Sequence, residues 1–343
     1  MHRKEHEAVK GISLRKGNSG PAAMSYVAKR LVQIPIVVFL VVTLGFVLLK
    51  MAPGDPVSLF AGEGASPQYI ETIRKAYGLD KPIPEQYKNY ITGIFIGDWG
   101  FSLTFERPVL KVIMERIPLT LLLSFTAFGI SIPLGVALGM IAALRRNSPI
   151  DAFLSSFATF FDSVPAFIIG LLLLYALSVY LGILPLGGFM TVGTVYGSLT
   201  ERLLDLLAHL VLPATSLALI WMVGYTRVIR NTMIEALQSD YVRAAVSRGI
   251  RHTSIIFKHA LRNSILSVVT LAGVQVGYML GGVILTETVF SWFGIGHLVV
   301  QAVSFRDYPL LMGILFFSSI WVAIVNLFVD VIYSVVDPRV RLS

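Results

Sequence analysis

The sequence contains no cysteine and has few charged residues. Of its 343 residues, 14% are charged and 55% are hydrophobic, and the mean hydropathy is +0.75. Soluble globular proteins carry about 25% charged residues, so this chain lacks the polar surface of a lone soluble enzyme, a disordered protein or a nucleic-acid binder. The absence of cysteine also excludes disulfides, thiolate metal sites and cysteine nucleophiles.

The sequence also lacks the motif of a nucleotide-binding loop. No Gly-x4-Gly-Lys-Ser/Thr segment occurs, so the chain cannot hold ATP phosphates in a P-loop of its own. The segment His2–His6 matches the spacing of one zinc peptidase motif, but it lies in a charged, Gly/Ser-flanked tail without a third ligand. We therefore expect no bound cofactor, no metal and no catalytic residue in this chain.

Long apolar runs take the place of a polar surface. A bilayer core about 30 Å thick is crossed by about 20 residues of helix. The first run is longer than the core of a cleaved signal peptide, about 7–15 residues, and no Ala-x-Ala site follows it. The sequence therefore predicts an all-α membrane protein with six transmembrane helices. The six runs are Leu31–Leu49, Leu119–Leu144, Ala152 to about Leu184, Leu206–Val223, Ile265–Leu285 and Leu310–Val336.

The charges between the runs predict the orientation of the chain. Segments 1–30, 145–151, 227–264 and 337–343 carry 18 Lys/Arg and 6 Asp/Glu. The polar segments on the other side, 50–117, 201–205 and 306–307, carry 10 Lys/Arg and 11 Asp/Glu. Positively charged loops stay in the cytoplasm, so the pattern predicts a multi-pass protein of the cytoplasmic membrane with both termini inside. The net charge of +8 is then a topology signal rather than a nucleic-acid-binding face.

These assignments predict a flexible inner tail (1–25), a first span (26–51), an outer segment (52–117), a five-helix core (118–337) with an inner loop at 227–264, and a short inner C-terminus (338–343). The outer segment is too long for a mere connection. Ser66 and Pro67 form a helix start and Gly78 a stop, and Pro84 opens a second helix. Two compatible interpretations remain: a small cap packed on the spans, or a docking or gating element over a transport path.

Three acidic residues lie in or beside the predicted spans: Asp162, Glu287 and Asp330. A charged side chain within lipid is costly, so such residues are functional candidates by default. Asp162, which precedes Pro165, either lines a path or makes an interhelix contact. For Glu287 we expect an interhelix hydrogen bond, and for Asp330 an ion pair with a loop arginine.

The inner loop between the fourth and fifth spans contains a predicted short helix. Asp240 or Ser239 can cap its start, and Gly249 can adopt the left-handed conformation that ends it. A helix of two to three turns is unstable alone in water, so it must gain stability by packing. Tyr241, Ala244 and Ala245 are the side chains that it can offer, and small residues let another helix or surface approach closely.

The segment Asp240–Gly249 resembles the EAA loop of ATP-binding cassette importer permeases, a short helix that sits in a groove of the ATPase subunit. Residues Arg243, Ala244, Ala245 and Gly249 match that pattern. From about residue 25 onward, the chain resembles the permeases of dipeptide, oligopeptide and nickel importers, which implies a type I importer permease fold. The stretches that carry this resemblance are Ala52–Pro56, Tyr77–Pro84, Gly97–Asp98 with Ser102–Thr104, Asp240–Gly249, His259–Asn263, Glu287–Phe290, Arg306–Pro309 and Asp337–Arg339.

The resemblance implies several partners and a division of labour. A second, homologous permease would complete the translocation path, an extracellular or periplasmic binding protein would deliver the substrate, and two separate ATPase subunits would bind ATP and Mg. The chain itself would be a non-catalytic subunit that couples ATP hydrolysis to alternating access. Related permeases carry dipeptides, longer peptides, nickel complexes or oligosaccharides. Peptide is our first expectation, and an ATP-independent carrier or channel is the remote alternative.

Two residues depart from the family pattern. Arg243 stands where the pattern often has Glu; counted from Asp240 as the cap, that position would be the third of the helix, where Glu closes a capping box. A cation in the first turn also opposes the helix dipole. Ser267 stands where related chains commonly have proline at the entry to the fifth span.

Overall fold

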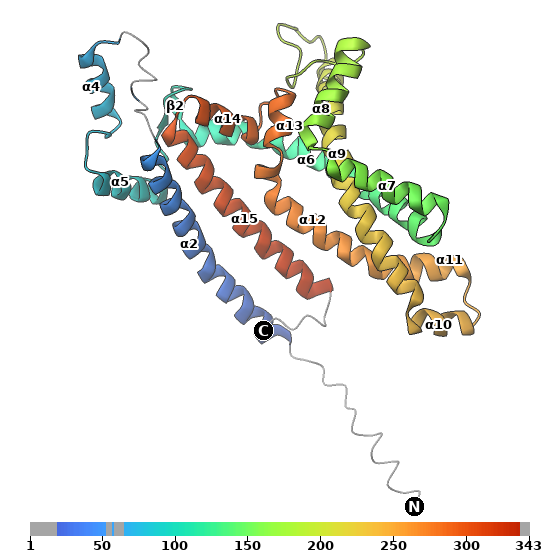
Figure 1. Ribbon diagram of the computed structural model, residues 1–343. Helices are drawn as coiled ribbons and strands as arrows, with labels where there is room; N and C mark the ends of the chain where they lie inside the picture. Colours follow the sequence, from blue (N-terminus) through green and yellow to red (C-terminus); the bar gives the residue numbers. More distant parts are fainter. Residues whose placement is uncertain (1–18, 53–56, 58–64, 337–343) are drawn as a thin grey trace, which may run out of the picture.

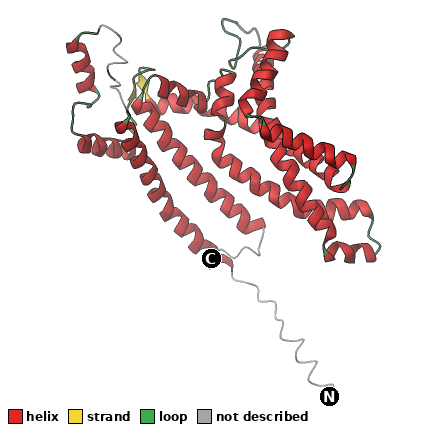
Figure 2. Cartoon of the chain, viewed as in Figure 1, coloured by secondary structure: helices red, strands yellow, loops and turns green. Residues whose placement is uncertain are grey.

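A computed structural model describes residues 19–52, 57 and 65–336 of the chain. This part is almost entirely helical (Figure 2). Within it, five helices are long and apolar enough to cross a membrane, and a bent helix pair brings the number to six. The all-α membrane fold predicted from the sequence is confirmed. The segment His2–His6, most of the stretch Ala52–Pro56, and the stretch Asp337–Arg339 lie outside the described residues.

The first and last helices, α2 (Ser19–Met51) and α15 (Tyr308–Val336), pack side by side (Figure 1). Val42 and Phe46 of α2 meet Met312 and Phe316 of α15 in a buried cluster. Helix α2 begins at Ser19, seven residues before the predicted start of the first span. Most of its apolar side chains remain exposed, as expected of a helix that faces lipid.

The segment after α2 contains both predicted helices, α4 (Pro67–Ala76) and α5 (Ile83–Ile96). The Ser66 hydroxyl accepts the Tyr69 N–H at 3.2 Å and caps α4, and Gly78 follows in the left-handed region with φ +63°. Helix α5 lies across one end of α2 (Figure 1). A two-stranded antiparallel sheet, β1 (Phe101–Ser102) and β2 (Arg107–Pro108), then leads into the core; the sequence did not predict it.

Helices α6 (Val109–Leu144) and α9 (Leu199–Gln238) form the central pair of the bundle. Both are longer than their predicted spans: α6 begins ten residues before Leu119, and α9 runs on through the first part of the predicted loop 227–264. Glycines let them approach closely. A Cβ atom at Gly135 would lie 2.5 Å from Tyr225 Cβ, and one at Gly139 would lie 2.5 Å from the Thr226 carbonyl oxygen.

The third predicted span is not one straight helix. It consists of α7 (Pro149–Ser163) and α8 (Ala166–Leu174), followed by a π-helical segment, η1 (Tyr175–Tyr180). The two parts are bent by 95°, and Val164 between them has an extended backbone. Pro165 explains the break, because proline disfavours the helical conformation in the residue before it. The apolar run predicted from Ala152 to about Leu184 therefore forms a bent helix pair, which gives the sixth span when the two parts are counted together.

After α9 the chain forms α10 (Asp240–Ser247), turns back through α11 (His252–Ser254) and the π-helical η2 (Ile255–Leu261), and continues as α12 (Arg262–Gly282). Two short helices, α13 (Ile284–Val289) and α14 (Ile295–Ser304), then connect to α15. Helices α10 and α11 lie at one end of the bundle, whereas α4 and α14 lie at the other (Figure 1).

Candidate functional site

Helix α10 begins directly where the long helix α9 ends. Ser239, with φ −71° and ψ 154°, breaks the run between them and is the N-cap residue of α10. Its carbonyl oxygen accepts the N–H groups of Val242 and Arg243, at 3.2 and 3.1 Å. Ser239 rather than Asp240 is therefore the cap, and Arg243 is the fourth helical residue. The capping-box position falls on Val242, so the capping argument made for Arg243 does not apply.

The end of α10 is a Schellman motif centred on Gly249. Gly249 has φ +72°, and its N–H donates to the Val246 carbonyl at 2.9 Å. The Ile250 N–H donates to the Ala245 carbonyl at 3.2 Å, and Ile250 packs against the same buried cluster as Ala245. These are the two backbone bonds and the apolar contact that define this stop signal. The role predicted for Gly249 as the end of the helix agrees with this geometry.

The two faces of α10 differ in burial. Val242 and Ala245 are buried against Ile255 of η2. On the opposite face, Ala244 and Ser247 are exposed. This side exposes small side chains and helix backbone, which a partner surface can approach closely.

Larger exposed side chains flank this face. Tyr241 is 42% exposed and Val246 is 58% exposed. Arg243 is also exposed and lies 3.7 Å from Asp240 in an ion pair open to solvent. Of the predicted docking residues, Ala245 is therefore occupied by packing within the chain, and Tyr241, Arg243 and Ala244 are accessible.

A side-chain contact connects α10 to the membrane helix that follows. The Asn263 amide at the start of α12 donates a hydrogen bond to the Tyr241 hydroxyl at 2.9 Å. Ala260 and Ile256 of η2 are buried against the last turns of α9. Helix α10 thus has contacts with the ends of both α9 and α12, two helices that belong to candidate membrane spans.

The three predicted acids all make contacts between helices. Asp162 of α7 accepts a hydrogen bond from Arg227 of α9 at 2.7 Å. Asp330 of α15 lies 3.0 Å from Arg30, which belongs to α2 rather than to a loop. Glu287 is fully buried in α13. That any of them lines a path stays a prediction.

Comparisons with known proteins agree on one family. Residues 135–342 match the family described as the binding-protein-dependent transport system inner membrane component, and residues 23–124 match its N-terminal region. The chain belongs to this family of importer permeases. A probable peptide ABC transporter permease of Sinorhizobium fredii is 36% identical over 316 residues, which cover 92% of this chain and 99% of the relative.

A second curated relative agrees with that assignment, and one solved structure was also matched. The glutathione transport system permease GsiC of Escherichia coli K12 is 37% identical over 318 residues, covering 93% of this chain and 99% of GsiC. A solved inward-facing structure of the methionine ABC transporter MetNI is 18% identical, with a TM-score of 0.49, and the match covers 67% of this chain and 96% of that one. The family match and the curated relatives show that the protein is a multi-pass subunit of an ABC importer in the inner membrane, and such a permease works with ATPase and substrate-binding partners.

Two of the permease motifs meet each other in the structure. Asp307, from the stretch Arg306–Pro309, is fully buried, and its carboxylate accepts the Ser102 hydroxyl at 2.5 Å and the Thr104 N–H at 2.9 Å. Its other oxygen accepts the Leu310 N–H at 3.1 Å and so caps α15. The Asp307 carboxylate therefore holds the β1–β2 hairpin against the N-terminus of α15.

Glu287 has a similar role at the start of α14. Its carboxylate accepts the Thr120 hydroxyl at 2.6 Å and the His297 N–H at 2.9 Å, and the Thr120 oxygen accepts the Ile295 N–H at 2.8 Å. Negative charge is favoured at a helix N-terminus. Burial raises the pKa of Glu287 to about 7, and the hydrogen bonds from Thr120, His297 and Gly296 act in the opposite direction. The predicted interhelix role of Glu287 agrees with these contacts.

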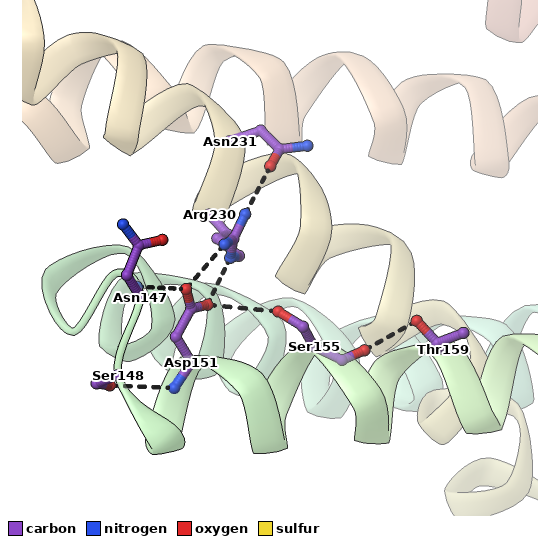
Figure 3. A network of polar contacts seen from close by, with 7 residues as sticks. All are labelled: Asn147, Ser148, Asp151, Ser155, Thr159, Arg230 and Asn231. Carbon is purple, nitrogen blue, oxygen red and sulfur yellow. Dashed lines mark hydrogen bonds and ion pairs between the residues drawn. The ribbon is translucent and has the colours of Figure 1, made fainter.

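A buried ion pair that the sequence did not predict holds α7 against α9 (Figure 3). Arg230 of α9 donates to both oxygens of Asp151, at 2.6 and 2.8 Å, and the Asp151 side chain is only 5% exposed. The same carboxylate accepts the Asn147 N–H at 3.0 Å. One sequence signal pointed to a structural role for Asp151: it lies in the first turn of a helix capped by Ser148. Its partner, about eighty residues away, could not be read from spacing.

The two ion pairs between α7 and α9 are expected to differ strongly in strength. Breaking the buried Asp151–Arg230 pair with Asp151→Asn should destabilise the permease by about 3 kcal/mol, because Arg230 loses its charged partner. The exposed Asp162–Arg227 pair, with side chains 55% and 43% exposed, is expected to contribute about 0–1 kcal/mol. Thermal unfolding of the single and double mutants of each pair gives the two coupling energies and checks this difference. Equal coupling energies would show that the buried pair does not hold α7 to α9.

Proposed function

We propose that this permease imports peptides in an ATP-driven complex and that α10 is the element on which the ATPase acts. The observation that carries the proposal is the construction of α10. It is an eight-residue helix with a cap at one end, a Schellman motif at the other, and exposed small residues on its outer face. An isolated helix of this length is not stable alone. The helical conformation of α10 therefore depends on its contacts with η2 and, we infer, on contacts with a protein partner.

The length of α9 supports a mechanical role for α10. Helix α9 is a continuous 40-residue helix, which corresponds to about 60 Å at 1.5 Å per residue. Only Ser239 separates its end from the start of α10. Movement of α10 by a nucleotide-driven subunit would therefore rotate a single rod that reaches the opposite end of the bundle. This is a rigid-body transition of the kind that couples distant sites.

The surroundings of α10 indicate the charge of the partner. From Asp240 to Asn263 the chain carries five Lys/Arg residues and one acid. Tyr241, Val246 and Phe257 are exposed apolar side chains in the same region. We propose that the ATPase presents an apolar groove with acidic residues at its rim. ATP and Mg bind to that subunit, since this chain has no P-loop.

The remaining parts of the assembly follow from the same proposal. The excess of lysine and arginine around α10 supports the proposal that this end of the bundle faces the cytoplasm, together with both termini. A second permease, related to this one, completes the translocation path. The substrate class is proposed to be peptides, because similar permeases are named for peptide and glutathione transport and glutathione is itself a short peptide. Oligosaccharides and nickel complexes are the alternatives.

Uptake by the reconstituted complex tests this function. Vesicles that contain the permease pair and ATPases, supplied with the binding protein, are expected to accumulate labelled peptide only when ATP is present on the α10 side. Vesicles with the ATPases omitted serve as the control. Peptide accumulation without ATPases would contradict the proposal, and ATP-dependent uptake of an oligosaccharide or nickel complex in place of peptide would contradict only the substrate class.

A further inference from the structure

A cavity of about 690 Å³ lies between α2, α5 and the start of α15, at the end of the bundle opposite α10. Its aromatic walls are formed by Phe46, Tyr90, Trp99, Phe101 and Tyr308. This volume is within the range of small-molecule sites, and such sites combine apolar walls with a few polar groups. Because none of its lining residues belongs to α10 or to the segment that follows it, the cavity is separate from the proposed coupling element.

The cavity contains one cation and one carboxylate. Lys50 of α2 donates a hydrogen bond to the Gln86 side chain and lies 5.6 Å from the centre of the Phe46 ring. Asp98 accepts the Gly100 N–H at 3.0 Å. Within the described part of the chain, neither Lys50 nor Asp98 forms an ion pair. Two opposite charges that line one cavity without ionic partners are complementary to a zwitterionic ligand.

An unsatisfied hydroxyl adds a second observation. Tyr308 lines the cavity, and its hydroxyl oxygen is buried without a hydrogen-bond partner among the described residues. A buried polar atom without a partner is costly. A hydrogen bond from this hydroxyl to an acceptor oxygen of a ligand would remove this cost. A ligand group that accepts a hydrogen bond from Tyr308 and also pairs with the Lys50 ammonium would be anionic, such as a phosphate.

The position of the cavity favours a lipid as the source of that group. Lys50 is in the last turn of a candidate membrane span, so it lies near a membrane boundary, where lipid headgroups are found. Ile36, Phe39 and Val47 of the same helix are 45–55% exposed and lie 14, 11 and 3 residues before Lys50, so they form an apolar stripe on the helix face that carries Lys50. Tyrosine and tryptophan are typical of this membrane depth.

We propose that this cavity binds the headgroup of a phospholipid with a primary amine, with its phosphate at Lys50 and its ammonium at Asp98. An acyl chain would follow the exposed apolar stripe of α2. The bound lipid would join α2, α5 and α15, which meet around the cavity. A quaternary ammonium cannot donate a hydrogen bond to Asp98, so phosphatidylethanolamine should bind more tightly than phosphatidylcholine.

Native mass spectrometry of the purified, assembled transporter tests the proposal, with phosphatidylethanolamine, phosphatidylcholine and phosphatidylglycerol as probes. Asp98→Asn keeps an acceptor for the Gly100 N–H and should weaken phosphatidylethanolamine binding about tenfold, as expected for the loss of a charge-assisted hydrogen bond. Lys50→Met should weaken binding of all three lipids. Lys88→Met, an exposed α5 position that does not line the cavity, is the matched control and should change nothing.

Three results would overturn the proposal. Equal retention of phosphatidylethanolamine by Asp98→Asn and the unchanged protein would remove the ammonium site. Equal affinity for all three lipids would show that the headgroup is not recognised. Displacement of the lipid by a free dipeptide would assign the cavity to a soluble zwitterion. Because the readout is lipid retention, it is independent of whether peptide uptake depends on α10.

Discussion

Replacing Gly249 with valine is expected to abolish ATP-driven uptake while the permease still inserts and folds. Gly249 has φ +72°, a conformation that a β-branched residue avoids. A Cβ atom there would meet no neighbour within 4 Å, so the effect comes from backbone strain alone. Relief of that strain would change the end of α10 and break its two terminal hydrogen bonds. We expect uptake and stimulated ATP hydrolysis to fall more than tenfold, in assays on reconstituted vesicles.

Asparagine at the same position provides the control. Asn tolerates the left-handed conformation better than other non-glycine residues, and the open space around Gly249 accommodates its side chain. Gly249→Asn should therefore retain uptake within about threefold of the unchanged protein, a strain difference of under 1 kcal/mol at 1.4 kcal/mol per tenfold change. If valine and asparagine behave alike, the geometry of the helix end is not what the ATPase requires.

The second large effect is expected at the α6–α9 contact. In Gly139→Ala, the new methyl group would lie 2.5 Å from the Thr226 carbonyl oxygen and 2.9 Å from Ile229 Cβ. The first of these atoms is backbone, so the two helices must separate. Overpacking of this kind costs about 1–3 kcal/mol, or more where the surroundings cannot adjust. We expect a clear fall in the thermal unfolding temperature and in the yield of folded protein.

Gly129 on the same helix is the matched control. A Cβ atom there meets nothing within 4 Å, and alanine is the better helix former by about 1 kcal/mol. Gly129→Ala should therefore leave the unfolding temperature unchanged or raise it slightly. A similar loss of stability in both variants would mean that helix propensity, rather than the close approach of α6 and α9, determines the result.

The close α6–α9 contact shows one limit of prediction from sequence. Gly135 and Gly139 form a small-xxx-small pattern that is typical of tight helix packing in membranes, so the signal for a close contact was present. The partner helix was not predictable, because the apolar surfaces of several helices are equivalent in sequence. The same limit applies to the pairs Asp151–Arg230 and Asp307–Ser102, whose members are far apart along the chain.

The local features of α10 were more predictable. Its existence, its approximate bounds and the left-handed glycine at its end follow from capping rules that act over a few residues. Which face is buried was not predictable, because Ala244 and Ala245 are chemically identical and differ only in what η2 covers. The sequence left the cap open between Ser239 and Asp240, since both are good N-cap residues, and the structure has Ser239 in that role.

The long helices show how tertiary contacts extend local structure. The predicted fourth span ended at Val223, but α9 continues to Gln238. Polar residues in the sequence mark where a helix leaves the lipid. The helix does not end at that point if its next turns are packed against other helices. Ile229 and Met233, beyond the predicted end, are fully buried. Pro165 had the opposite effect and divided an apolar run that hydropathy alone treats as continuous.

Cross-linking from α10 tests the central claim most directly, and the absence of cysteine from the chain makes the experiment specific. A single cysteine at Ala244, on the exposed face of α10, should form a cross-link with the ATPase subunit in the assembled transporter, and the cross-linked complex should no longer import peptide. A cysteine at Ala52, an exposed residue at the end of α2, should form none. A cross-link to the ATPase from Ala52 but not from Ala244 would contradict the account.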